Sequence, residues 1–111
     1  MPSDTPVLDT LELMTASSLE NCRLGTRDLM LVRLAALVAA DAPSSSYLMN
    51  IVAAAAADAG VTIEDAQDVL VAVAPIVGTV RVVSAAAKLE EALGFVIAAM
   101  VEAELEATPD P

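Results

Sequence analysis

Apolar residues recur at helical spacing along this chain of 111 residues, in segments that proline, glycine and serine separate. Thr5 followed by Pro6 is typical of a helix cap and a first helical position, and it predicts a first helix. Gly25 offers a left-handed stop and Thr26 a new cap, so a second helix is expected over Arg27–Ala40. Apolar side chains surround most of this second helix, which we therefore expect at the centre of the fold.

One loop is clear in the pattern, from Asp41 to Ser46. Pro43 disfavours helical backbone at the residue before it, and the serines that follow are good caps. A third helix is expected from about Tyr47 to Ala59, with its end at Gly60.

The next helix has the strongest start signal in the chain. Thr62 and Asp65 have the spacing of a capping box, so a fourth helix is expected to begin there. It should run to about Ile76 and leave at Gly78. A fifth, long helix is then expected over Thr79–Glu106.

No segment shows a longer strand-like alternation than Val69–Val73, and that segment follows a helix cap. The sequence therefore predicts an all-α fold, a compact bundle of about five helices with a long C-terminal helix. It is expected to form a single domain over residues 1–111, with residues 1–6 and 107–111 as frayed tails. Because 57% of the residues are apolar, the chain should have more apolar surface than its own bundle can cover.

The fifth predicted helix has two contrasting faces on a helical wheel. Its polar stripe is interrupted by Phe95, and the block Phe95–Val101 is apolar on every side. We therefore expect a homo-oligomer whose interface includes Phe95; the alternative is that Phe95 folds back onto its own subunit. The polar stripe holds Ser84, Lys88, Glu91, Glu102 and Glu106, and the core face holds Val82, Leu89, Leu93, Val96, Ile97 and Met100.

Charge and cysteine usage narrow the classes of partner. Sixteen acidic against five basic residues give a formal charge of -11, which repels nucleic acid and anionic lipid surfaces. No apolar run is long enough to cross a membrane, and no secretory signal is visible at the N-terminus. Cys22 is the only cysteine, so an internal disulfide is excluded. We expect a cytoplasmic protein that binds neither nucleic acid nor membranes.

Three sets of residues resemble a known family: Thr26-Arg27-Asp28-Leu29 at the start of an apolar helix, Ala59–Asp65 before another, and Ala74-Pro75 with Gly78. This pattern resembles the carboxymuconolactone decarboxylase-like family, which includes the alkylhydroperoxidase D-type proteins, over about residues 8 to 100 of this chain. The resemblance implies an all-helical subunit that assembles as trimers or hexamers. It also implies a site at the start of the third helix, with Cys-x-x-Cys and His in the peroxidase branch and His in the decarboxylase branch.

The chain departs from that family pattern at the site. Counting forward from Thr26 places the family's histidine at Tyr47, and counting back from Gly60 places it at Val52, yet the chain has no histidine. The segment Ser44–Asn50 has no thiol either. Thiol peroxidase chemistry is excluded, because it needs a reactive thiolate and a resolving partner. Decarboxylase chemistry loses its expected acid-base group.

No catalytic, cofactor or metal site is assigned, but four residues are candidates: Tyr47, Asn50, Arg33 and Arg81. Arg33 sits on the most apolar helix and needs a partner, for which Asp58, Glu64 and Asp68 are the candidates. The simpler interpretation is a paired arginine that braces the bundle or an interface. The alternative is that Arg33 or Arg81 binds a small acidic ligand beside Tyr47 and Asn50.

Other reactive residue types have simpler explanations. Cys22 is expected to be a buried structural cysteine, and the serines of the predicted loop to cap the helix. Glu102, Glu104 and Glu106 lie on different faces of a helix and predict a solvated acidic end rather than a metal site.

Two functions from different classes follow. The first is a noncatalytic, self-assembling member of the family, acting as an oligomeric scaffold or as a binding module. The second is an enzyme on a small acidic or lactone substrate, with Tyr47, Asn50, Glu64 or Arg81 as acid-base and anion-holding groups.

Overall fold

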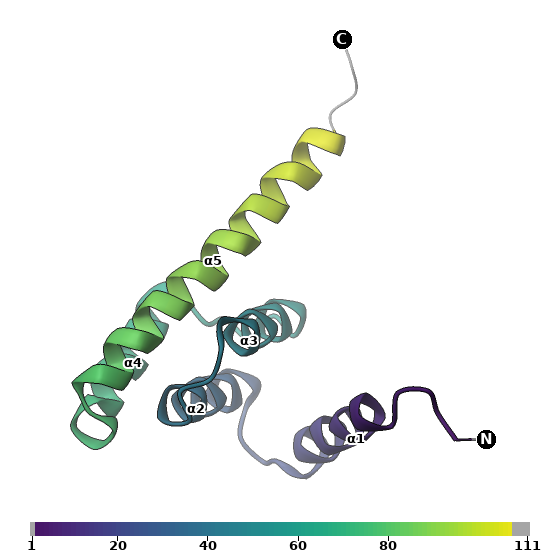
Figure 1. Cartoon of the computed structure of the whole chain (residues 1–111), viewed down its shortest axis with the longest axis horizontal. Helices are drawn as coiled ribbons and strands as arrows, with labels where there is room; N and C mark the ends of the chain where they lie inside the picture. The colour runs from purple at the N-terminus through teal and green to yellow at the C-terminus, as the bar shows by residue number, and fades with distance from the viewer. Residues whose placement is uncertain (1, 108–111) are drawn as a thin grey trace.

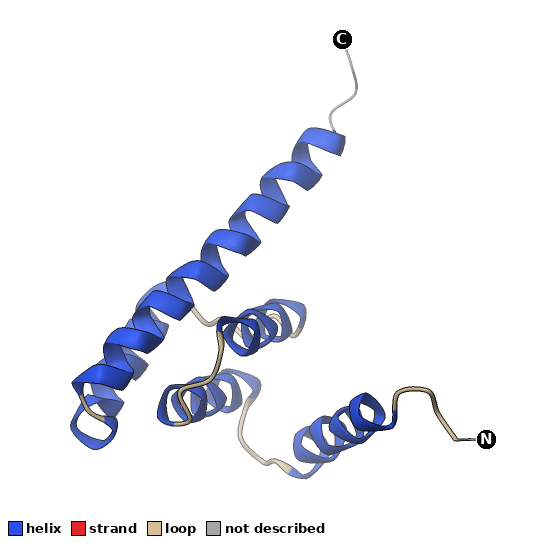
Figure 2. Ribbon diagram, in the orientation of Figure 1, coloured by secondary structure: helices blue, strands red, loops and turns tan. Residues whose placement is uncertain are grey.

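The computed structural model describes residues 2–107, which form five α-helices and no strand (Figures 1 and 2). The all-α prediction is confirmed, including the helical interpretation of Val69–Val73, and the last helix is the long one. Of the tails expected at residues 1–6 and 107–111, residues 1 and 108–111 lie outside the described residues, while Pro6 begins α1 and Ala107 ends α5. The helices are α1 (Pro6–Asn21), α2 (Thr26–Ala39), α3 (Ser44–Ala56), α4 (Ile63–Val77) and α5 (Thr79–Ala107).

Helices α2 to α5 pack around one apolar core. Alanine forms much of this core, so the helix backbones can approach closely. The predicted central helix, α2, contacts α3, α4 and α5, but its Val32 side is exposed, so it is not covered on nearly all sides as expected. The core residues are Leu34, Val38, Ala42, Tyr47, Ala66, Leu70, Ala85, Leu89 and Ala92.

An aspartate, rather than a glycine, ends both α2 and α3. Asp41 and Asp58 have positive φ angles of 52° and 49°, and each is followed by a buried alanine whose N–H bonds back to the helix. This is the Schellman motif, in which aspartate tolerates the left-handed conformation. Two expectations are therefore wrong: α3 ends at Ala56 and not at Gly60, and Gly25, with a φ of -60°, is the N-cap of α2 and not a left-handed stop.

The third helix also begins earlier than predicted, at Ser44 instead of Tyr47. Pro43 is its N-cap in extended backbone, with φ -72° and ψ 163°, and its carbonyl accepts the N–H of Ser46 at 3.0 Å. The serines therefore form the first helical turn instead of the end of a loop.

The predicted capping box at the start of α4 is confirmed. Thr62 Oγ1 accepts the N–H of Asp65 at 3.0 Å, and Asp65 Oδ2 accepts the N–H of Thr62 at 3.0 Å. Arg27 Nη2 lies 2.6 Å from Asp65 Oδ1, which ties the start of α2 to the start of α4. The hydrogen bond from the Thr62 backbone, together with Arg27, lowers the pKa of Asp65. Gly78, with a φ of 90°, ends α4 as predicted.

Two helical segments project from the bundle (Figure 1). No Cα atom of α1 lies within 8 Å of another described helix, and α5 continues past the core as residues 94–107, which we call the α5 extension. The chain exposes 8031 Å² of surface, against about 5,700 Å² for a compact monomer of this mass. Its radius of gyration is 16.3 Å, against about 13 Å for a compact domain of this length.

Candidate functional site

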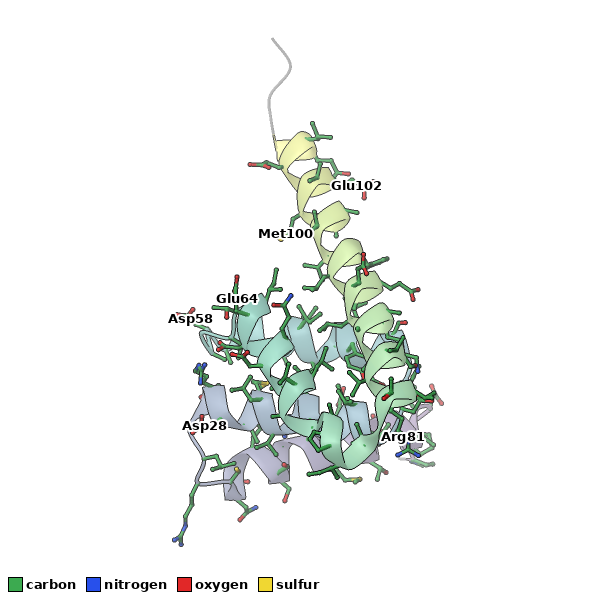
Figure 3. All side chains as sticks on the ribbon, turned by 90° about the vertical axis from the view of Figure 1, so that its left-hand side faces the viewer. Asp28, Asp58, Glu64, Arg81, Met100 and Glu102 are labelled. Carbon is green, nitrogen blue, oxygen red and sulfur yellow. The ribbon has the colours of Figure 1, made fainter. Side chains whose placement is uncertain are left out.

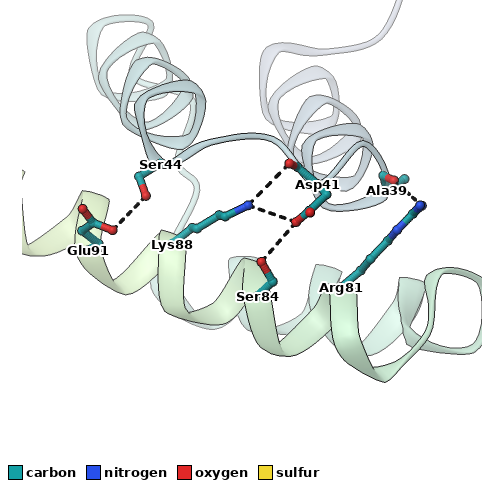
Figure 4. A network of polar contacts seen from close by, with 7 residues as sticks. All are labelled: Ala39, Asp41, Ser44, Arg81, Ser84, Lys88 and Glu91. Atoms are coloured by element: carbon teal, nitrogen blue, oxygen red, sulfur yellow. Dashed lines mark hydrogen bonds and ion pairs between the residues drawn. The ribbon is translucent and has the colours of Figure 1, made fainter.

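Residues of the predicted polar stripe of α5 bind the C-terminal end of α2 (Figure 4). Arg81 Nη1 donates to the main-chain oxygen of Ala39 at 2.7 Å. Ser84 Oγ and Lys88 Nζ donate to Asp41 Oδ1 at 3.1 and 3.0 Å. Cations near the last carbonyls of a helix are favourable, because those carbonyls have no partner within the helix. We call Arg81, Ser84, Lys88 and Asp41 the α2–α5 clamp, and its geometry is that of a structural contact.

The clamp also fixes the charge state of Asp41. The hydrogen bonds from Lys88 and Ser84 lower the pKa of this carboxyl below 3.8, its ordinary value. A lowered pKa in the folded state stabilises the fold above pH 3.8, and this contribution is lost as the pH falls through the folded-state pKa. The side chain is a stable anion at neutral pH, so it does not serve as a proton donor there.

Tyr47, at the position of the family's histidine when counted from Thr26, is a core residue. Its side chain is 1% exposed, and its hydroxyl has no hydrogen-bond partner among the described residues. Burial, and secondarily the negative charge of Asp41, raise the pKa of the phenol above 10.0. A neutral, enclosed phenol cannot reach a substrate in this conformation, so its first role is to fill the core.

We expect Tyr47→Phe to raise the free energy of unfolding by about 1 to 3 kcal/mol, because it removes a buried polar group that has no partner. Urea titration followed by circular dichroism measures this change. The raised pKa adds a second readout: wild-type stability should fall as the pH rises above 10.0, and the variant should lose less. A lower unfolding free energy for Tyr47→Phe would instead mean that the hydroxyl is bonded in solution.

The partner of Arg33 is not one of the predicted carboxylates. Arg33 Nη2 donates to Ser18 Oγ of α1 at 3.1 Å, and the side chain is partly exposed rather than enclosed by α2's apolar face. The expectation of a partner among Asp58, Glu64 and Asp68 is therefore replaced by a contact with the N-terminal helix. Arg33 therefore has a structural role, as the simpler interpretation predicted, but it connects α2 to α1.

A contact that the sequence did not indicate joins α3 to α5. Ser44 Oγ donates to Glu91 Oε2 at 2.9 Å, and both residues line a shallow hollow with Leu48 and Phe95. Phe95 remains 64% exposed there, so it does not fold back into its own core. Cys22, expected to be buried, is partly exposed at the end of α1.

An apolar pocket with a volume of about 300 Å³ lies among α2, α3, α4 and α5 and is a candidate binding site. Asn50, Asp58 and Thr62 are the polar residues of its lining, which includes no lysine or arginine. This size is at the lower end for small-molecule sites, and the lining favours an apolar ligand over an anion. Its apolar walls include Met30, Leu34, Ile51, Ala66, Leu89 and Leu93.

The four candidate residues do not converge on this pocket. Asn50 lines it, whereas Tyr47, one helical turn earlier, is enclosed in the core. Arg81 belongs to the α2–α5 clamp and Arg33 contacts α1. Glu64 is exposed, next to the pocket residue Ile63.

The pocket adjoins the foot of the α5 extension. Leu89 and Leu93 line the pocket, and the same side of α5 continues outward as Val96, Ile97 and Met100. Figure 3 shows Met100 on the side of the extension above Asp58 and Glu64, with Glu102 on the opposite side. The pocket and this side of the extension therefore form one apolar surface, which we call the α5 face.

Comparisons with known proteins give no relative from which to infer a function. No family model, curated protein or solved structure matches the chain. Between residues 2 and 107, no helix is long and apolar enough to cross a membrane. In the same part of the chain, no three or more His, Cys, Asp or Glu residues gather into a group that could hold a metal ion.

Proposed function

We propose that this chain is a noncatalytic subunit that assembles with copies of itself, as an oligomeric scaffold or a binding module. The observation that carries the proposal is the surface of 8031 Å², about 2,300 Å² more than a compact monomer of this mass exposes. A standard interface removes about 800 Å² from each partner. The excess is therefore large enough for more than one contact per subunit.

The kind of surface supports the same proposal. In the block Phe95–Val101 apolar residues occupy every side of α5, and a helix that is apolar all round is normally covered all round. In the single chain Phe95, Ile97 and Met100 are all more than half exposed. Contiguous apolar surface of this kind marks an interaction site in soluble proteins. Burying about 1,000 Å² of it contributes up to about 25 kcal/mol before the cost of association.

The noncatalytic part of the proposal is supported by where the polar groups lie. Arg81 is engaged by a carbonyl of its own chain and Arg33 by Ser18, while the pocket contributes Asp58 and no cation. The pocket has no cationic side chain to bind an acidic substrate, so the alternative that the chain is an enzyme on a small acid or lactone has less support. Turnover of a small acid or lactone that Tyr47→Phe abolishes would overturn the noncatalytic assignment.

The helix-boundary motifs that resemble the carboxymuconolactone decarboxylase-like family belong to this proposal as well. The capping box of α4 and the exit at Gly78 form as those motifs imply. We propose a trimer or hexamer, the assemblies that the resemblance implies, in the cytoplasm. The net charge of -11 favours partners other than nucleic acid.

Size-exclusion chromatography with light scattering at micromolar concentration tests the assembly. We expect a mass that is a multiple of 11.3 kDa, and a wild-type monomer would refute the proposal. Phe95→Glu should shift the mass toward the single chain, because it places a charge in the contact. Val80→Glu is the matched control, since Val80 is exposed on the same helix but at the opposite end from the extension.

A further inference from the structure

We infer that α1 of one copy docks on the α5 face of a second copy, and that this exchange holds the copies together. The inference rests on the self-assembly proposed above and adds a contact on the side of α5 away from Phe95. It follows from two helical segments that have no partner in the single chain, and from the sides on which their apolar residues lie.

The first segment is α1, which is amphipathic but unpacked. Its apolar residues fall within an arc of about 140° that also contains Thr15 and Ser18, while Leu13 lies on the opposite, polar side. The apolar residues of this arc are all exposed. Among the described residues one hydrogen bond joins α1 to the bundle, from Arg33 to Ser18, and because Ser18 lies within the same arc, docking on a second copy encloses or replaces this bond. A helix of this length is marginal in water by itself, so α1 needs a surface to pack on. We call Val7, Leu8, Leu11, Met14 and Leu19 the α1 face.

The second segment is the α5 extension, whose inner side is the outward part of the α5 face. In the bundle this side of α5 buries Ala85, Leu89 and Ala92, and in the extension it continues with Val96, which is partly buried, and Ile97, which is exposed. Met100 is 66% exposed there. The pocket at the foot of the extension has mostly apolar walls and a volume of about 300 Å³, which suits the side chains of a docked helix.

The two segments match in length and lie at opposite ends of the molecule. The 16 residues of α1 span about 24 Å, and residues 94–107 span about 21 Å. Figures 1 and 3 place α1 at one end of the bundle and the α5 extension at the other. Each copy can therefore dock its α1 on one neighbour and bind the α1 of another neighbour on its α5 face. Such a head-to-tail exchange forms a ring of copies when the rotation from one copy to the next closes.

The charges are compatible with this contact. Asp9, Glu12 and Glu20 lie off the α1 face, and Glu102 lies on the side of α5 away from Met100 (Figure 3). Glu104, one helical turn after Met100, lies on the same side as Met100, near the tip of the extension. Docking over Val96, Ile97 and Met100 therefore buries apolar side chains and leaves Asp9, Glu12, Glu20 and Glu102 in water, and Glu104 marks the outer limit of the contact. The required area is also present, because the excess surface of each chain exceeds what one standard interface uses.

A pair of matched variants on α1 tests the inference. Leu11→Glu places a charge on the α1 face, and Leu13→Glu makes the same change on the polar side, where Leu13 is already 70% exposed. We expect Leu11→Glu to reduce the mass by light scattering to 11.3 kDa, and Leu13→Glu to keep the wild-type mass. Circular dichroism checks that both variants retain the helical bundle.

Crosslinking between two different chains identifies the receiving surface. In a Cys22→Ser background, a chain with Leu11→Cys is mixed with a tagged chain with Met100→Cys and treated with a bismaleimide. We expect a mixed product of two chains, and much less of it when Leu13→Cys replaces Leu11→Cys. Failure of Leu11→Cys to exceed the Leu13→Cys control would overturn the inference, because α1 would then lie elsewhere or on its own α5.

The outcomes separate this inference from the proposed function. A wild-type monomer refutes self-assembly itself. A wild-type oligomer that Leu11→Glu leaves intact refutes only the exchange of α1, and directs attention to the Phe95 side of the extension.

Discussion

Truncation of Leu34 to alanine should lower the free energy of unfolding by about 3 kcal/mol, within the range of about 2 to 5 kcal/mol for a large core side chain. Leu34 is buried at the centre of α2 and belongs to the core that α2 to α5 share. Its removal leaves a cavity that helices already in close contact cannot easily fill. For a domain of this size, such a loss is a large part of the total stability.

Leu13→Ala is the control for this prediction, because Leu13 is the same residue type on an exposed helix side. Its effect should stay within about 0.5 kcal/mol. Urea titrations of both variants at one protein concentration give the comparison. Equal losses at Leu34 and Leu13 would mean that α1 is as well packed as the core, which contradicts the described arrangement.

The positions of the helices were largely predictable because their ends depend on local signals. Pro6 at a first helical position, the Thr62 and Asp65 capping box and the exit at Gly78 each act within a few residues. Each is found where the sequence indicated. The all-α class follows from the same signals, because the helices that they delimit account for most of the chain.

The wrong helix ends occur where more than one residue type can adopt the conformation that ends a helix. Glycine is the usual left-handed residue after a helix, so Gly60 was the expected end of α3. Asp58 takes that conformation two residues earlier, as Asp41 does after α2. Aspartate is an allowed but less frequent choice there, and the buried alanine that follows each aspartate is visible only in the packed structure.

The candidate site was predictable only in part, because its partners are distant in sequence. A helical wheel places Ser84, Lys88 and Glu91 on one side of α5, but it does not reveal that this side faces the ends of α2 and α3. Arg81 binds a main-chain carbonyl 42 residues away, which no side-chain pattern encodes. The burial of Tyr47 likewise depends on how α2, α3 and α5 pack together.

Raising the NaCl concentration from about 0.01 M to about 1 M should tighten the assembly at least tenfold. Each chain has a formal charge of -11, and neither α1 nor the α5 extension contains a lysine or arginine. Two like charges about 10 Å apart in water repel by about 0.4 kcal/mol, so about four such pairs oppose association by a factor of ten. Salt shortens the Debye length from about 30 Å to about 3 Å and removes this repulsion. Sedimentation velocity at several salt concentrations measures the dissociation constant.

Salt also strengthens apolar contacts, so a variant with fewer negative charges on the two segments separates the two effects. The variant Glu12→Gln with Glu102→Gln and Glu106→Gln should assemble more tightly than the wild type at low salt and respond less to added NaCl. Weaker assembly at high salt would contradict this account, because it would mean that ion pairs join the copies. The sign of the salt effect therefore distinguishes an apolar interface that forms against charge repulsion from one that charges build.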